Sequence, residues 1–370
     1  ARFLTNKYLF NNISLKTRLK RHYQHNGLTS HVVGYINRIN QKDIKLLTKN
    51  KRLSLYKGSD HIGKRGIEQR YENLIHGIPG FEKIEVDAKG NIIRTLEKKE
   101  PIHGQDIQLS IDIELQKKAV DAFGERKGAL VALSPHNGEI LAYVSQPYFN
   151  PNLFVNGIDH KNWNILNTNK ARPLLDRVTK GLYPPGSTIK PFIAIAGLEN
   201  NLRVPPFQIN DPGFFTMPNQ SKTFRNWKRD GHGQVDMVKA IAVSSDTFFY
   251  GLGLELGLDK MNQTLKAYGF GHKTGVDILG EKNGLVANKE WKIKNKKERW
   301  YAGETVITAI GQGFTLVTPI QLANATAKIA LPNNQNYVSP HLLLNSNQLK
   351  QRNDKLYTPP PNKKNTMSYI

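Results

Sequence analysis

A serine and a lysine three residues apart are the first pair in this sequence that could carry out nucleophilic chemistry. Ser187 and Lys190 stand at the start of an apolar run, and the pattern over 188–199 predicts a buried helix. Residues three apart share one face of a helix. A partly desolvated lysine can be neutral and accept the serine proton. The helix N-terminus favours an oxyanion that forms beside it.

This pair alone is weak evidence, because a serine at a helix start is also an ordinary cap. The same spacing occurs at Ser54–Lys57, in a polar stretch, where we interpret the serine as structural. A later segment adds support, since Ser244, Ser245 and Asp246 place two hydroxyls and a carboxylate before an aromatic helical run. A similar unit at 110–112 precedes the first serine and lies on a predicted strand. Order and context therefore favour the later segment.

The elements that must position these residues indicate an α+β fold rather than a doubly wound sheet. Strands are predicted at 129–133 and 139–144, joined by an Asn-Gly turn that suits a short hairpin loop. Core helices follow the strands, beginning with 188–199. We assign this dense region, residues 106–370, to one domain.

Residues 1–105 are more basic and more polar, and we interpret them as a separate small α+β module. The pattern predicts a strand at 31–36, a helix at 66–75 and a hairpin that pairs 81–87 with 91–96. The run 98–105 is expected to be a linker between the module and the larger domain.

Composition limits the function classes. The chain has 370 residues and no cysteine, which excludes disulfides, thiolate catalysis and zinc fingers. Its 53 Lys+Arg against 30 Asp+Glu give a net charge of +23, so nucleic acid, anionic lipid and anionic polymers are candidate partners. The cations are scattered, however, and no helix-turn-helix, RRM or KH pattern accompanies them. A nucleic-acid-binding protein therefore stays an alternative that rests on charge alone.

Four segments together resemble the class B penicillin-binding transpeptidases. They are Tyr183–Pro191, Ser244–Tyr250, Gly269–Asp277 and Gly311–Gln321. Further segments at 31–35, 63–68, 150–158 and 211–215 resemble the elongation-type members of rod-shaped Gram-negative bacteria. The resemblance covers nearly the whole chain. It implies a transpeptidase domain, with an antiparallel sheet flanked by helices and the serine on a central helix, and an N-terminal pedestal related to dimerisation domains.

The resemblance also implies roles for the matching residues. Ser187 would be the acylated nucleophile, Lys190 its base, Ser244 the relay to the departing amine, and Asp246 a group that orients substrate or lysine. Ser187, Ser244 and Asp246 would contact the substrate, a peptidoglycan stem peptide ending in D-Ala-D-Ala. β-Lactams would be trapped as acyl-enzymes. No cofactor is implied. A water-directed D-Ala carboxypeptidase is left open, because the choice between water and amine depends on pocket shape.

Two departures from the family pattern matter. The third motif, Lys–Ser/Thr–Gly–Thr, should follow the segment at 311–313, but the only Lys-Thr-Gly is at 273–275, before it. We therefore expect that the sequence stops short of this motif, and a penicillin-sensing relative without turnover stays an alternative. Some close relatives also bind zinc through two Asp, one His and one Cys. The matching residues here are Asp211, Asn226, His232 and Ser245, so we predict no zinc.

The resemblance also implies a location and partners. The chain begins without methionine, and no run reaches about 18 apolar residues. We expect a single membrane anchor upstream of the sequence, attachment to the bacterial inner membrane and a catalytic domain in the periplasm. The expected partners of residues 1–105 are the glycan polymerase of the elongation machinery and its scaffold protein, and nucleic acid is not among them.

Overall fold

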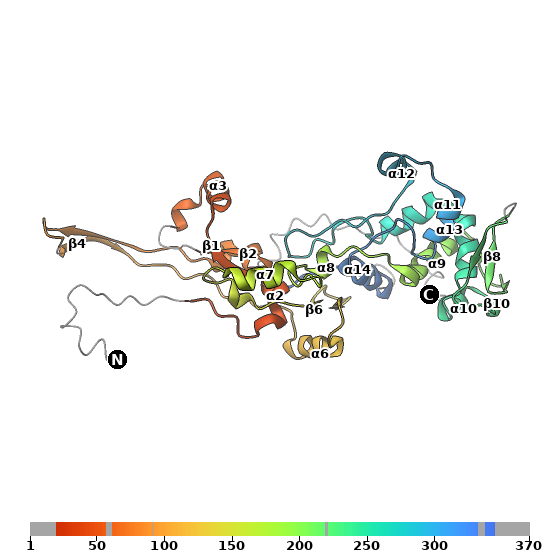
Figure 1. Ribbon diagram of the computed structural model, residues 1–370, viewed down its shortest axis with the longest axis horizontal. Helices are drawn as coiled ribbons and strands as arrows, with labels where there is room; N and C mark the ends of the chain where they lie inside the picture. Colours follow the sequence, from red (N-terminus) through yellow and green to blue (C-terminus); the bar gives the residue numbers. More distant parts are fainter. Residues whose placement is uncertain (1–19, 57–60, 91, 219–220, 332–336, 345–370) are drawn as a thin grey trace.

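The computed structural model describes residues 20–56, 61–90, 92–218, 221–331 and 337–344. Figure 1 shows an elongated molecule, with a two-stranded ribbon at one end and the helices and hairpins of residues 190–310 at the other. None of the helices within these ranges is both long and apolar enough to cross a bilayer.

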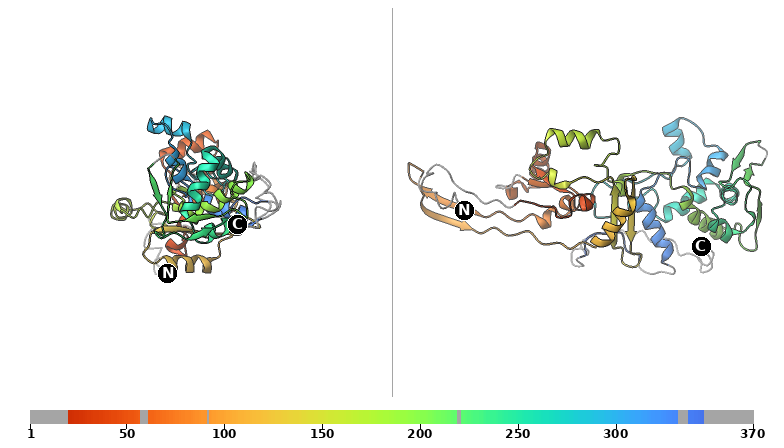
Figure 2. Two further views of the ribbon diagram at one scale, coloured as in Figure 1. Left: turned by 90° about the vertical axis from the view of Figure 1, so that its right-hand side faces the viewer. Right: turned by 60° about the horizontal axis from the view of Figure 1, so that its bottom comes forward.

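The N-terminal region is the small α+β module that the sequence predicts. Its elements are η2 (Asn26–Thr29), α2 (Ser30–Val33), β1 (Tyr35–Arg38), α3 (Gln41–Lys49), η3 (Leu53–Tyr56), β2 (His61–Arg65), α4 (Gly66–Arg70), α5 (Glu72–Ile75), β3 (Phe81–Val86) and β4 (Ile92–Lys99). β1 pairs with β2, and β3 pairs with β4, both antiparallel. The β3–β4 ribbon projects away from the rest of the molecule (Figure 2).

Three expectations for this module are wrong in detail. The strand expected at 31–36 begins only at Tyr35, because residues 30–33 form a helical turn that ends at Gly34 with φ 78°. The helix expected at 66–75 is broken at Tyr71 into α4 and α5. The linker expected at 98–105 is partly paired, since β4 runs to Lys99 and Ile102 exchanges two backbone hydrogen bonds with Ile78.

The larger region combines short antiparallel hairpins with packed helices. Its elements are α6 (Ile113–Phe123), β5 (Gly128–Leu133), β6 (Ile140–Gln146), η4 (Pro151–Leu153), α7 (His160–Thr168), α8 (Arg177–Lys180), η5 (Gly186–Ile189), α9 (Lys190–Glu199), β7 (Ile209–Asp211), β8 (Phe214–Thr216), β9 (Thr223–Arg225), β10 (Gly233–Val235), α10 (Met237–Ala242), α11 (Asp246–Ala267), α12 (Lys289–Lys296), α13 (Ala302–Thr308) and α14 (Pro319–Ala330). The strand pairs are β5–β6, β7–β10 and β8–β9. The predicted hairpin over 129–144 is confirmed. In place of one flanked sheet, the described residues form separate two-stranded sheets.

The main core lies where α9 crosses α11. Phe192 and Ile193 of α9 and Phe248, Phe249 and Leu252 of α11 are all buried in it. Both helices are apolar on most of their surface because neighbouring elements surround them, which is the pattern of buried helices. This packing brings the first residues of the two helices, which are the candidate catalytic residues, toward each other.

The N-terminal module and the larger region share buried contacts. The Tyr71 hydroxyl donates to the Asp277 carboxylate at 2.8 Å, and Tyr35 stacks on Phe154 with ring centroids 4.1 Å apart. The Arg65 guanidinium donates to the carbonyl of Leu174 at 2.6 Å. Because these contacts come from several elements of both regions, the module is packed against the larger region rather than joined to it only by the chain.

Backbone hydrogen bonds join the turn that carries Ser187 to residues 311–317. Tyr183 and Val317 exchange two such bonds, and the Gly186 amide donates to the Gly311 carbonyl at 2.9 Å. Gly311 has φ 73°, and a Cβ at this position would overlap the Gly186 carbonyl oxygen. A glycine is therefore required directly beside the candidate nucleophile.

We predict that Gly311→Ala destabilises the fold and displaces the turn before Ser187. Gly313→Ala is the matched control, because Gly313 has a similar φ of 80° but its Cβ would make only ordinary contacts at 3.7 Å and beyond. The control should cost about 1 kcal/mol of unfolding free energy, from the backbone conformation alone, and Gly311→Ala about 3 kcal/mol or more. Thermal denaturation measures both. An equal loss of unfolding free energy in the two variants would show that the contact between Gly311 and Gly186 tolerates a side chain.

Candidate active site

The Lys190 side chain is the centre of the site. It is the first residue of α9, only 2% exposed, and its ammonium meets three acceptors. Nζ lies 2.8 Å from the carbonyl oxygen of Ser244, 2.9 Å from its Oγ, and 2.6 Å from Asp246 Oδ1. Three acceptors match the three N–H groups of a protonated lysine. The structure thus brings together three of the four residues that the sequence singled out.

Burial and the carboxylate act on this lysine in opposite directions. Burial lowers the pKa of Lys190, and the hydrogen bond and negative charge of Asp246 raise it, with a net lowering from the ordinary value. A lowered pKa makes the neutral amine, which can accept a proton, more accessible near neutral pH. Lys190 therefore has the environment of a general base.

Ser187 lies on the turn that leads into this helix. It belongs to η5 and is exposed, and its carbonyl accepts a hydrogen bond from the Lys190 amide. The N-cap residue of α9 is Ile189, and no side chain caps this end of the helix. The hydroxyl of Ser187 is therefore not used as a helix cap. The helix predicted over 188–199 thus becomes a 3₁₀ turn followed by α9. Pro191 stands in the first turn, as the sequence predicts.

The backbone conformation at Ser244 is unusual, and it lies in the turn that places Ser244 and Asp246 against Lys190. Ser244 has φ 53°, a left-handed conformation that is uncommon for residues other than glycine and occurs often at functional sites. Ser245 caps α11 through its hydroxyl, so Asp246 becomes the first residue of the helix. The helix dipole favours a carboxylate at that end. The other oxygen of Asp246 accepts a hydrogen bond from the Trp227 amide at 3.2 Å.

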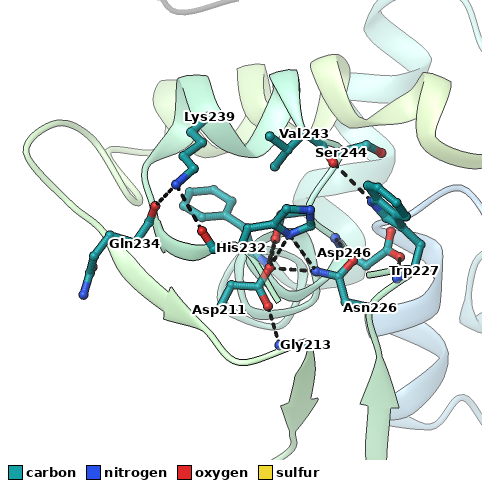
Figure 3. Close-up of polar contacts among 12 residues, drawn as sticks. Asp211, Gly213, Asn226, Trp227, His232, Gln234, Lys239, Val243, Ser244 and Asp246 are labelled. Carbon is teal, nitrogen blue, oxygen red and sulfur yellow. Dashed lines mark hydrogen bonds and ion pairs between the residues drawn. The ribbon is translucent and has the colours of Figure 1, made fainter. Parts of the chain in front are cut away.

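Behind Asp246 lies a buried polar network centred on Asp211 (Figure 3). Asp211 Oδ2 accepts hydrogen bonds from Asn226 Nδ2 at 2.7 Å and Ser245 Oγ at 2.8 Å, and His232 Nδ1 lies 2.8 Å away. Burial alone raises the pKa of Asp211, but the hydrogen bonds from His232 and its other donors outweigh burial and lower it overall. Asn226 Oδ1 also accepts from the Asp246 amide at 3.3 Å. The network therefore fixes the backbone that carries the candidate Asp246 carboxylate.

Sequence reasoning identified these four residues only as a degenerate metal site and missed Trp227. Trp227 donates through its indole Nε1 to the Val243 carbonyl at 3.1 Å, in addition to its bond to Asp246. No motif marks this tryptophan, and its position in a charged, irregular stretch was the only signal available. Its role depends on contacts between β9 and the start of α11.

The Asp211 network does not fit a zinc ion. His232 and Asp211 are already engaged with each other, and Asn226 and Ser245 contribute an amide and a hydroxyl, which are poor zinc ligands. The second ring nitrogen of His232 is buried and has no hydrogen-bond partner among the described residues, and these residues contain no group of three His, Cys, Asp or Glu side chains that could hold a metal ion. We derive no step through a metal.

Three other segments have the same residue spacing as the candidate motifs, and the structure gives the described residues of each a different environment. Ser110 is buried and donates to the Ile140 carbonyl, and Asp112 caps α6. Ser54 is exposed on η3, and Lys57 lies outside the described residues. The Lys-Thr-Gly at 273–275 lies in an irregular loop, where Thr274 donates to the buried Glu281 carboxylate. The interpretation of 273–275 as something other than the third motif is consistent with this position.

We predict that the protein purified without chelator contains far less than one zinc per chain, because the ligand set is incomplete. The matched control restores the set with Asn226→Asp and Ser245→Cys in one variant, which should raise zinc content toward one per chain. Elemental analysis measures both proteins. Stoichiometric zinc in the unaltered protein that is lost in His232→Ala would contradict the prediction.

Comparison with known proteins gives the family. Residues 128–369 match the penicillin binding protein transpeptidase domain, and residues 1–109 match the penicillin-binding protein dimerisation domain. The chain is 48% identical over 343 residues to the peptidoglycan D,D-transpeptidase MrdA of Acinetobacter baumannii, covering 93% of this chain and 50% of that protein. The chain thus spans about half the length of this curated relative.

Two solved structures are similar along almost the whole chain. One is penicillin-binding protein 2 of Pseudomonas aeruginosa in complex with WCK 5153, with 42% identity, a TM-score of 0.78, and coverage of 90% of this chain and 68% of that one. The other is a complex between penicillin-binding protein 2 and MreC from Helicobacter pylori, with 36% identity, a TM-score of 0.83, and coverage of 93% and 63%. The expected fold, a transpeptidase domain with an N-terminal dimerisation module, is therefore confirmed, and the chain belongs to the penicillin-binding protein transpeptidase family.

Proposed function

We propose that this chain belongs to a peptidoglycan D,D-transpeptidase that cross-links stem peptides during cell elongation. The observation that carries the proposal is the buried Lys190, held between Ser244 and Asp246 at the start of the helix that follows Ser187. Family membership and the similarity to a protein named D,D-transpeptidase support the reaction class.

The proposed reaction has two acyl transfers. In the first, Ser187 Oγ attacks the carbonyl between the two terminal D-alanines while neutral Lys190 accepts its proton. The tetrahedral intermediate collapses, and the departing D-alanine amine takes a proton through Ser244, which lies 2.9 Å from Lys190 Nζ. In the second, an amine of a neighbouring strand attacks the ester and gives its proton to Lys190, which returns it to the departing Ser187 oxygen and restores the hydroxyl. A β-lactam would follow the first half only and leave an acyl-enzyme.

Hydrolysis of the acyl-enzyme is the other outcome of the same chemistry. Water in place of the amine would make the protein a D-Ala carboxypeptidase, and the buried lysine serves both reactions. The family's third motif, which the resemblance places beyond 311–313, would supply further substrate contacts. We infer that the natural protein is attached to the inner membrane with this domain in the periplasm, as the family resemblance implies.

We infer that the N-terminal module binds the scaffold and the glycan polymerase of the elongation machinery. The β3–β4 ribbon supports this, because an isolated two-stranded hairpin is marginal in water and this one exposes several large apolar side chains. They include Phe81, Ile84, Ile92, Ile93 and Leu96. The Helicobacter pylori relative was solved in complex with MreC. A partner on the ribbon would cover this apolar surface.

We predict that labelled penicillin forms a covalent adduct at Ser187 in the full-length protein. Ser187→Ala should abolish the adduct, and Lys190→Ala should reduce its rate at least about 100-fold, because the hydroxyl loses its base. Ser54→Ala is the control and should acylate normally. Peptide mapping by mass spectrometry locates the adduct. An adduct at Ser54, or a near-normal rate in Lys190→Ala, would refute the assignment.

The pH dependence of acylation should report Lys190. The rate is expected to rise with pH as the lysine loses its proton, with a midpoint below the ordinary lysine pKa, because burial lowers it. Asp246→Asn removes the negative charge that raises the pKa of Lys190, so the midpoint should move to lower pH even if the maximal rate falls. Stopped-flow acylation across pH measures it. A midpoint that stays in place or moves upward would mean that Asp246 does not act on the lysine.

A further inference from the structure

A cavity of about 240 Å³ lies on the outer face of the β8–β9 hairpin. Its lining residues are Gly213, Phe214, Thr223, Arg225 and Arg229. Phe214 and Arg225 are paired across the hairpin, so their side chains share one face. The other face carries Phe215 and Phe224, which pack near the Tyr250 ring in α11. The hairpin thus turns one face to the core and the other to this cavity.

The turn after β9 folds back over the start of β8 and brings the second arginine to the cavity. The Asn226 amide donates to the Gly213 carbonyl at 2.8 Å. Gly213 has φ 90°, and a Cβ there would overlap the Arg229 carbonyl oxygen, so only glycine permits this close approach. Arg225 and Arg229 therefore lie at one cavity because of the fold, although three residues separate them in the sequence.

The two guanidinium groups are available to a ligand. Within the described part of the chain, neither Arg225 nor Arg229 forms an ion pair with a carboxylate, whereas Arg21, Arg94 and Arg203 each do. Both arginines are exposed. Residues 221–230 contain four cations and one acid, Asp230, so the local potential is positive. Guanidinium groups bind carboxylates through paired, charge-assisted hydrogen bonds.

The cavity is tied to the catalytic carboxylate by a short stretch of backbone. Trp227 stands between the two arginines, and its amide donates to Asp246 Oδ2 at 3.2 Å. The Tyr250 hydroxyl of α11 donates to the Arg225 carbonyl at 3.2 Å. Figure 3 shows Gly213 and Asn226 at the ends of neighbouring strands, close to Asp246 and Trp227. The cavity is therefore linked through Arg225 and Trp227 to the first turns of α11, which carry the candidate Asp246.

We propose that this cavity is a subsite for a carboxylate of the peptidoglycan stem peptide, other than the carboxylate of the terminal D-Ala-D-Ala. The proposal rests on the proposed function. Arg225 and Arg229 bind the carboxylate, Thr223 offers a hydroxyl, and the half-exposed Phe214 ring covers the aliphatic part of the same residue. The match of the chain to the penicillin binding protein transpeptidase domain favours a peptide carboxylate over nucleic acid.

Direct binding of a peptide tests the proposal without requiring turnover. The probe is a fluorescently labelled stem tetrapeptide with free side-chain carboxylates, compared with the same peptide carrying amides in their place. The full-length protein should bind the carboxylate form at least about tenfold more tightly than the amide form, as anisotropy titration would measure. The double variant R225Q/R229Q should bind both forms equally. The single variant K228Q is the matched control, because it removes a cation of the same turn that does not line the cavity.

Each outcome decides the proposal. Equal binding of the two peptides by the parent protein overturns it, as does a preference that survives in R225Q/R229Q with an unchanged melting temperature. A loss of the preference in K228Q as large as in the double variant also overturns it, because the effect would then be diffuse charge. Penicillin labelling of the parent protein is measured separately. A missing adduct at Ser187 would defeat the proposed function while carboxylate-selective binding still established the subsite.

The donor and acceptor peptidoglycan strands carry the same side-chain carboxylates. Competition with penicillin shows which of the two strands the cavity binds. Pre-acylation with unlabelled penicillin occupies the donor position at Ser187. If the labelled peptide keeps its carboxylate preference afterwards, the cavity serves the acceptor strand, and if the preference disappears, it serves the donor strand. Both results support the subsite.

Discussion

The buried ammonium of Lys190 is the constraint on which the active site depends. A charge inside the protein is tolerated only when it is paired and hydrogen-bonded, and here the three acceptors all come from Ser244 and Asp246. Removing one partner of such a pair typically costs about 3–5 kcal/mol, because the other charge remains buried. The start of α11 must therefore stay against the start of α9. The same pairing sets the reactivity of the lysine, since burial and the carboxylate shift its pKa in opposite directions.

The surroundings of this pair are organised to keep Asp246 in place. Its amide is bonded to Asn226 and its carboxylate to the Trp227 amide, while Ser245 and Asn226 share the buried Asp211. This network joins β7, β9 and the start of β10 to the first turn of α11. The left-handed backbone at Ser244 is retained within it. A hydrogen-bonded core of this kind can position a carboxylate without a metal, provided that each donor finds its acceptor.

Much of the fold was predictable from local pattern. The hairpin over 129–144, the aromatic helix after Asp246 and the ribbon over 81–96 were confirmed because periodicity and turn residues determine them locally. The helix expected at 66–75 is interrupted at Tyr71, where a hydrogen bond to Asp277, about two hundred residues away, fixes the side chain. The strand expected at 31–36 gives way to a helical turn that ends at Gly34. These departures occur where the module meets the larger region, and local pattern carries no information about such contacts.

The sequence by itself indicated the candidate residues and the family. The spacing of Ser187 and Lys190, the later Ser244 and Asp246, and the order of the motifs were sufficient to select these candidates and to indicate the family, because motif spacing along a helix or turn is a local property. Only the tertiary structure decided which acceptors the lysine has, that the Trp227 amide bonds the Asp246 carboxylate, and that Arg225 and Arg229 line one cavity. These depend on the crossing of α9 with α11 and on a glycine that lets one loop approach another. Both are long-range packing events, which no single stretch of sequence specifies.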